Sequence, residues 1–106
     1  MQTQEEILDH ITRTIVEQFD PYRIVLFGSR ARGDAAEDSD YDILVEMESE
    51  LPFAKRGAAV SLALWPRLYS LDLVAYTPQE SERQRGKIGS IASVAEAEGA
   101  VLYERR

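Results

Sequence analysis

Three carboxylates in two short apolar segments are the residues best placed to do chemistry. Asp40 and Asp42 flank Tyr41 at the start of an apolar run, and alternate side chains of a strand point to the same face. Asp72 lies between two leucines of a second alternating run. If the two strands are neighbours, all three carboxylates line one polar face. Such a face suits Mg²⁺, which prefers carboxylate and phosphate oxygens, and two such ions can act on one phosphoryl centre.

A glycine-serine pair precedes these carboxylates and directly follows a predicted buried strand. Gly28 lets backbone donors approach phosphate oxygens closely, and Ser29 adds a hydroxyl donor. Gly28 and Gly33 have the spacing of half a P-loop, but Asp34 and Ala35 stand where lysine and serine or threonine are needed. The sequence therefore excludes a P-loop ATPase. An aspartate pair without such a glycine is more simply a solvated acidic turn.

The elements that must position these residues follow from capping signals and hydrophobic periodicity. Thr3 and Glu6 form a capping box, and apolar residues then recur at helical spacing. We expect, in order, a helix from Thr3 to Phe19, strands at 22–27 and 41–45, a helix from Pro52 to Pro66, a strand at 71–76, a helix from Thr77 divided near Gly86 and Gly89, its last part at 88–98, and a strand at 101–103. The 28–39 segment is expected to be a loop with one helical turn.

This order predicts an α/β protein of the α+β type, with helices packed on a small mixed sheet. The 106 residues fit one domain, which we assign to 1–106. In the helix after Pro52, Ala54, Ala58, Leu62 and Trp65 share a face, and both Phe53 and Trp65 are expected in the core.

Composition excludes several classes of protein and site. Lys and Arg total 12 against 19 Asp and Glu, a net charge of −7, which argues against a protein that grips long nucleic acid. The absence of cysteine excludes disulfides, zinc-thiolate sites and a cysteine nucleophile. His10 alone cannot build a multi-histidine metal site, and we expect it at the surface or in helix packing. The tail Arg105-Arg106 is expected to be solvated.

Localisation follows from what the sequence lacks. Its longest nearly apolar stretch is far shorter than the roughly 20 residues that span a bilayer. The acidic start lacks the basic region and apolar run of a secretory signal. We therefore expect a soluble cytoplasmic protein that does not associate with membranes.

Two segments together resemble the signature of the DNA polymerase β-like nucleotidyltransferases, and more narrowly that of the minimal nucleotidyltransferases. They are Gly28-Ser29-Arg30-Ala31-Arg32-Gly33 and Ser39-Asp40-Tyr41-Asp42-Ile43-Leu44-Val45. The glycine-serine pair, the spacer, the Ser-Asp-x-Asp motif and the apolar strand all agree. The resemblance implies a polymerase β-like fold over nearly the whole chain.

The resemblance also implies roles for the site residues. Gly28, Ser29 and Ser39 would hold the triphosphate of ATP. Asp40 and Asp42 would bind two Mg²⁺ ions, and Asp72, as a third metal-binding carboxylate, would help to activate the attacking hydroxyl.

Two arginines in the glycine-serine segment have two interpretations. Arg30 and Arg32 are the cations nearest to the proposed triphosphate and could neutralise charge that develops there. Alternatively, they balance the acidic residues of the same loop, Asp34, Glu37 and Asp38. The sequence leaves both interpretations open for Arg30 and favours the functional one for Arg32.

The implied reaction is transfer of a nucleoside monophosphate from a nucleoside triphosphate with release of pyrophosphate. By resemblance, the acceptor is a tyrosine of a cognate HEPN-domain toxin, the nucleotide is ATP, and the protein is an antitoxin in a hetero-oligomer. Two alternatives remain. The chain neutralises a basic RNA-cleaving toxin by binding alone, or it modifies a small molecule or a nucleic-acid end together with a partner subunit.

Overall fold

A four-stranded mixed sheet forms the centre of the computed structural model, which describes residues 2–105. The strand order is β3-β2-β1-β4; β1 runs antiparallel to β2 and β4, whereas β2 and β3 are parallel. The elements are α1 (Gln4–Phe19), β1 (Arg23–Phe27), α2 (Ser29–Arg32), β2 (Tyr41–Glu46), α3 (Phe53–Leu62), β3 (Leu71–Tyr76), α4 (Pro78–Gln84), α5 (Ile91–Glu98) and β4 (Ala100–Glu104). The predicted class, helices on a small mixed sheet, is confirmed.

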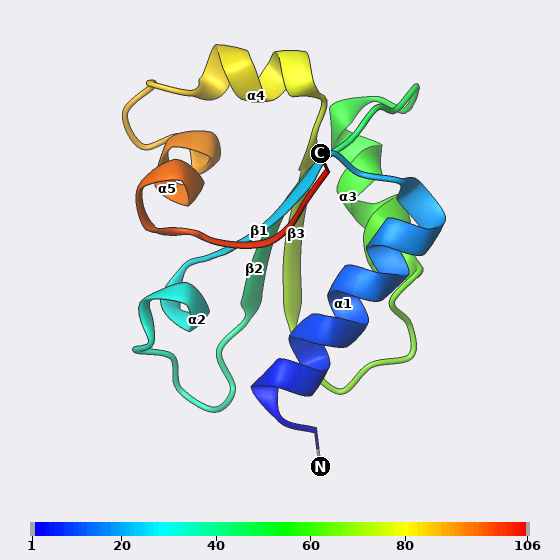
Figure 1. Ribbon diagram of the computed structural model, residues 1–106, viewed down its shortest axis with the longest axis vertical. Helices are drawn as coiled ribbons and strands as arrows, with labels where there is room; N and C mark the ends of the chain where they lie inside the picture. The colour runs from blue at the N-terminus through cyan, green and yellow to red at the C-terminus, as the bar shows by residue number, and fades with distance from the viewer. Residues whose placement is uncertain (1, 106) are drawn as a thin grey trace.

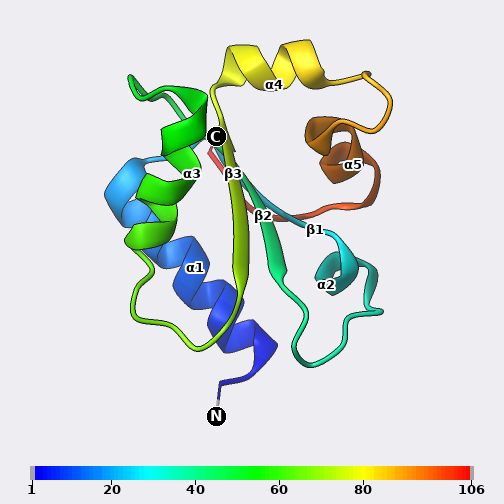
Figure 2. The same ribbon diagram turned by 180° about the vertical axis from the view of Figure 1, so that it is seen from behind.

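Helices lie on both sides of this sheet. Helices α1 and α3 cover one face, and α2, α4 and α5 lie on the other side (Figures 1 and 2). The larger core, between the sheet and α1 and α3, includes Ile11, Ile15 and Val60. A smaller core, between the sheet and α5, contains Val25, Leu44 and Ala95. The sheet therefore has one thoroughly packed face and one with less apolar cover.

The capping signals position the helices that follow them. The Thr3 hydroxyl accepts a hydrogen bond from the Glu6 N–H, and the Glu6 carboxylate accepts one from the Thr3 N–H. Thr77 and Glu80 make the same reciprocal pair at the start of α4. Both capping boxes are confirmed because they are local and need no tertiary contact to form.

The prediction for α3 is wrong in its extent and in its buried face. The helix ends at Leu62, before Trp65, and Trp65 is 60% exposed. Phe53, also expected in the core, is 47% exposed. A different face packs inward because a Cβ at Gly57 would lie 2.6 Å from the Leu73 carbonyl oxygen, so the helix approaches β3 through its glycine. The face bearing Ala54, Ala58 and Leu62 is exposed.

The C-terminal helical stretch begins later than the predicted 88–98. Gly89 has φ +79°, a left-handed conformation that interrupts the helix. Ser90 then caps α5 by accepting a hydrogen bond from the Ser93 N–H. Ile88 consequently lies in the connecting turn, fully exposed.

The surface expectations have mixed outcomes. His10 is exposed, as expected. Arg105 is not a free solvated tail, because its guanidinium pairs with Asp20 and stacks over the Tyr22 ring at 4.2 Å. Arg106 lies outside the described residues. No helix in residues 2–105 is long and apolar enough to cross a membrane.

Candidate active site

The register of β2 and β3 brings two of the predicted carboxylates side by side. Asp42 pairs with Asp72 across the parallel strands, so both side chains point to the same face of the sheet. This is the face on which Leu44 packs in the smaller core. Asp40, just before β2, and Asp72 are exposed, whereas Asp42 is partly buried. The strand pairing that the sequence left conditional is therefore present.

The electrostatics at Asp42 show that the carboxylates influence one another. Burial raises the pKa of Asp42, and the negative charges of Asp72 and then Asp40 raise it further; Arg32 has a smaller opposing effect. A carboxylate flanked by like charges is less stable in its ionised form. A bound cation would relieve this repulsion.

Gly28 lies directly against the Asp42 carboxylate. A Cβ at Gly28 would stand 2.1 Å from Asp42 Oδ2, and its φ of +73° lies in the left-handed region. Both constraints require glycine here. The glycine-serine pair therefore leads from β1 into α2 beside the carboxylates, as its position in the sequence suggested.

Glu98 is a residue of this region that the sequence reasoning missed. Its Oε1 accepts hydrogen bonds from the Gly28 N–H at 3.3 Å and from Arg32 Nη1 at 3.1 Å. A carboxylate thus contacts two groups that were predicted to hold phosphate oxygens. No local signal could have revealed it, because Glu98 reaches the site from the C-terminal end of α5, far along the chain.

Arg30 and Ser39 shape the loop that leads into β2. Arg30 Nη2 donates to the carbonyl oxygens of Ser39 and Glu37, both at 2.9 Å, and its guanidinium lies 4.4 Å from the centre of the Tyr41 ring. The Ser39 hydroxyl oxygen accepts from the Ala36 N–H at 2.9 Å. These contacts give both residues a structural role, and their nucleotide role stays a prediction.

Residues 9–97 match the nucleotidyltransferase domain family. The chain belongs to this family. The expected polymerase β-like nucleotidyltransferase fold is likewise confirmed.

Three known proteins are similar to this nucleotidyltransferase domain. It is 47% identical over 55 residues to "Protein adenylyltransferase MntA" of Thermococcus cleftensis, an alignment that covers 49% of this chain and 54% of the relative. The chain thus spans about half the length of that curated relative. A crystal structure of a toxin-antitoxin with AMP-PNP aligns with TM-score 0.64 and 20% identity, over 93% of this chain and 74% of that one. A structure described as a nucleotidyltransferase from Sulfolobus solfataricus aligns with TM-score 0.64 and 23% identity. That alignment covers 93% of this chain and 79% of the other.

The carboxylates of this nucleotidyltransferase domain lie on the sheet face beside Gly28. Within residues 2–105, no three acidic or histidine side chains converge as a ready metal-binding group. Asp42 and Asp72 nonetheless fit Mg²⁺, because that ion is commonly held by one or two carboxylates together with substrate phosphates and water. Metal binding by Asp40, Asp42 and Asp72 stays a prediction.

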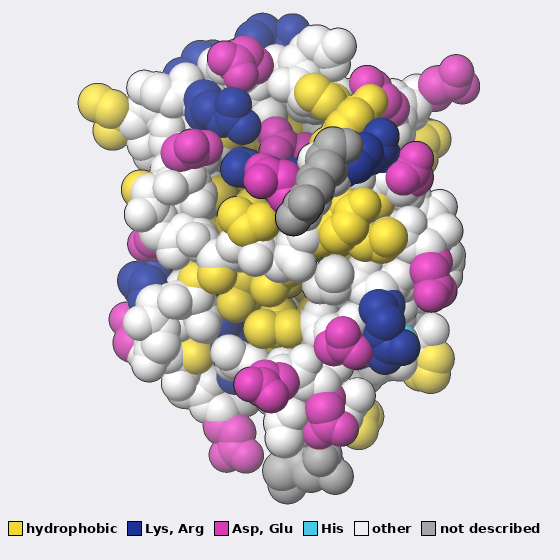
Figure 3. All heavy atoms as spheres, viewed as in Figure 1, with side chains coloured by type: hydrophobic (Ala, Val, Ile, Leu, Met, Phe, Trp, Pro, Cys, Tyr) yellow, Lys and Arg dark blue, Asp and Glu magenta, His cyan; other side chains and the backbone are white. Residues whose placement is uncertain are grey.

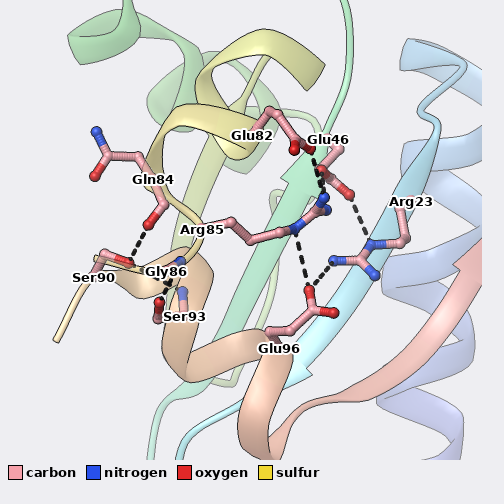
Figure 4. Close-up of polar contacts among 9 residues, drawn as sticks. All are labelled: Arg23, Glu46, Glu82, Gln84, Arg85, Gly86, Ser90, Ser93 and Glu96. Atoms are coloured by element: carbon pink, nitrogen blue, oxygen red, sulfur yellow. Dashed lines mark hydrogen bonds and ion pairs between the residues drawn. The ribbon is translucent and has the colours of Figure 1, made fainter. Parts of the chain in front are cut away.

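The far end of the same sheet face carries charges that are paired. Arg23 Nε contacts Glu46 Oε1 at 2.7 Å, and Arg85 contacts Glu46, Glu96 and Glu82 at 3.5, 3.2 and 2.9 Å (Figure 4). The network joins β1 and β2 to the end of α4 and to α5. It holds these helices on the nucleotidyltransferase sheet.

Proposed function

We propose that this nucleotidyltransferase transfers AMP from ATP to a tyrosine hydroxyl of a HEPN-domain toxin and thereby acts as its antitoxin. Family membership supports the reaction class. The relative named protein adenylyltransferase supports a protein acceptor, and the similar toxin-antitoxin structure with AMP-PNP supports a toxin partner and an adenine nucleotide.

The observation that carries the proposal is the pairing of Asp42 with Asp72 beside Gly28. In the reaction, the tyrosine oxygen attacks the α-phosphorus of ATP and forms a new P–O bond. The bond from the α-phosphorus to the bridging oxygen breaks, and pyrophosphate leaves. The hydroxyl proton passes to the Asp72 carboxylate, which is exposed and can release it to water.

The remaining residues bind and orient the nucleotide. Asp40, Asp42 and Asp72 would hold up to two Mg²⁺ ions, which supply positive charge to the phosphates when bound. Gly28 and Ser29 face the triphosphate from the loop after β1. Arg32 adds a positive charge to that of the metal ions at these phosphates, once its ion pair with Glu98 is released.

The decisive experiment separates transfer from binding. The HEPN-domain toxin that we propose as the acceptor is co-expressed with wild type, with Asp42→Asn and with Asp9→Asn, a control on the exposed surface of α1. We expect wild type and Asp9→Asn to add AMP to the toxin, seen by mass spectrometry, and to rescue growth. Asp42→Asn should lower the rate of addition by about 10³-fold, the scale seen when a charge-stabilising group is removed.

One outcome would replace the proposal. If Asp42→Asn rescues growth fully, and the toxin's mass is unchanged with every variant, the chain neutralises its partner by binding alone.

A further inference from the structure

A cavity of about 590 Å³ lies beside the first turn of α1, on the face of the sheet opposite to the Asp42 carboxylate. Its lining comes from four segments: the start of α1, Arg30 of α2, the loop that leads into β2 and the loop before β3. We call it the α1 cavity. We propose that the α1 cavity, with Leu68 at its edge, is a docking site for a basic segment of the acceptor protein. The proposal rests on the proposed function for the identity of the acceptor.

The α1 cavity and the proposed reaction centre share one end of the sheet. Tyr41 and Ser70 line the cavity, while Asp42 and Asp72 follow them by one and two positions in the sequence. At a rise of about 3.3 Å per residue, the two sites are separated by roughly 7 Å or less along the strands. A chain segment held in the cavity can therefore present a neighbouring tyrosine across the strand ends to the carboxylates.

The cavity offers an apolar and aromatic lining with one unused polar group. Leu68 lines the edge of the cavity and is fully exposed, so its side chain is available to a partner. The rings of Tyr41 and Tyr69 pack edge to face at 5.5 Å. The Tyr69 hydroxyl is buried and has no hydrogen-bond partner among the described residues. Such a lining suits an aliphatic or aromatic side chain with a polar group beside it.

Charge selects a basic partner over a second copy of this chain. Glu37 and Asp38 line the cavity and are exposed, and Asp40 follows them. Among the described lining residues, Arg30 carries the single positive charge, and its guanidinium donates to the main chain of the loop and to Gln4. Figure 3 shows acidic side chains around the end of the molecule where α1 begins. Two copies meeting here would bring like charges together, at a net charge of −7 each.

The test measures peptide binding without ATP. Three labelled peptides of equal length each contain one tyrosine and one leucine, flanked by lysine and arginine, by glutamine, or by glutamate, and their dissociation constants are measured by fluorescence anisotropy at low salt. We expect the basic peptide to bind at least tenfold more tightly than the glutamine peptide, and the acidic peptide to show no saturable binding. The difference should shrink at high salt, because exposed charges are screened.

Variants with matched controls locate the site. The double change Glu37→Lys with Asp38→Lys should weaken binding of the basic peptide by about tenfold, whereas Glu48→Lys with Glu50→Lys, exposed acids elsewhere, should change it less than twofold.

A second matched pair tests the apolar contact. Leu68→Ser should weaken binding by about tenfold, the scale of one lost apolar side chain, whereas Ile88→Ser, equally exposed elsewhere, should not.

Three results would overturn the proposal. They are the absence of saturable binding of the basic peptide up to millimolar concentration, equal effects of the cavity variants and their controls, and loss of AMP-PNP binding in Leu68→Ser with peptide binding intact. The last would assign the α1 cavity to the nucleotide. Because docking is measured without transfer, failure of AMP transfer with intact peptide binding would count against the proposed function only.

Discussion

The side chains of Asp42 and Glu46 lie on the same face of β2, yet Glu46 is paired with arginines whereas Asp42 lies among other carboxylates. Glu46 is 7% exposed and is contacted by Arg23 and Arg85. Asp42 lies beside Asp72 and near Asp40, and burial raises its pKa, with the two neighbouring charges adding to the shift. We refer to these as the paired end and the like-charged end of the sheet.

The difference shows which charges serve the fold. A buried carboxylate with two arginine partners is satisfied in the folded chain, and removal of one partner leaves a costly unpaired charge. Adjacent carboxylates of like charge oppose folding unless something binds them. A group of like charges that shifts a pKa is a candidate functional site. The like-charged end is therefore where we expect a ligand to bind.

The largest expected effect on stability is at a second ion pair, which joins α3 to α4. Arg56 is 6% exposed; it pairs with Glu80 and donates to the carbonyl oxygens of Leu51 and Ala75. Arg56→Met should lower the free energy of unfolding by about 3 kcal/mol, since it breaks an ion pair whose arginine is buried. Urea unfolding measures this change. The control Arg13→Met, in an exposed pair with Asp9, should cost under about 1 kcal/mol, and equal losses would refute the distinction.

Alanine substitutions at two glycines distinguish the effect of backbone strain from the effect of a side chain placed beside Asp42. Gly28 and Gly33 both have positive φ, but only a Cβ at Gly28 would meet the Asp42 carboxylate. Each change to alanine should lower the free energy of unfolding by about 1–3 kcal/mol through strain. Gly28→Ala should also abolish the thermal stabilisation by Mg²⁺ with AMP-PNP, whereas Gly33→Ala retains it. Retention in both variants would remove Gly28 from the nucleotide site.

Glu98 is a carboxylate near the like-charged end that does have partners. It contacts the Gly28 N–H and Arg32, both proposed to bind phosphates, so it competes with the triphosphate. Glu98→Gln should tighten AMP-PNP binding by about threefold to tenfold, measured by calorimetry with Mg²⁺, since one like charge is removed. Glu104→Gln, exposed on β4, serves as the control. Weaker binding in Glu98→Gln would mean that Glu98 positions these groups for the nucleotide.

The smallest effect is a pH dependence of stability that has opposite signs at Glu80 and at Asp42. The hydrogen bond from Arg56 lowers the pKa of Glu80, so its contribution to stability is present above the unfolded pKa and is lost as pH falls through the folded pKa. For Asp42, the raised pKa makes the contribution decline as pH rises. Glu80→Gln should flatten the acid limb of the stability curve, unlike the exposed control Glu82→Gln. Identical acid limbs in wild type and Glu80→Gln would contradict this assignment.

Local signals made much of the fold predictable. The capping boxes at Thr3 and Thr77 located two helices, and strand periodicity located the carboxylates of β2 and β3. The proximity of Gly28 to Asp42 was also predictable, because the neighbouring strands β1 and β2 bring the two residues together; their role in the active site stays a prediction.

What failed depended on tertiary contacts. The apolar face of α3 predicted burial of Trp65, but the close approach of Gly57 to β3 turns another face inward. Arg56 is buried on the inward face of α3, where the hydrophobic pattern predicts no charged residue. Its partner Glu80 lies beyond β3 in the sequence. Glu98 escaped prediction for the same reason, since only folding brings α5 to the loop after β1.

The most direct test compares Asp42→Asn with Glu46→Gln by thermal unfolding, each with and without Mg²⁺ and AMP-PNP. A ligand that binds only the folded state raises the melting temperature by mass action. We predict that Asp42→Asn keeps or gains stability without ligand and loses the ligand-induced shift, whereas Glu46→Gln loses stability and keeps the shift. An undiminished shift in Asp42→Asn would contradict the assignment of the like-charged end as the nucleotide and metal site.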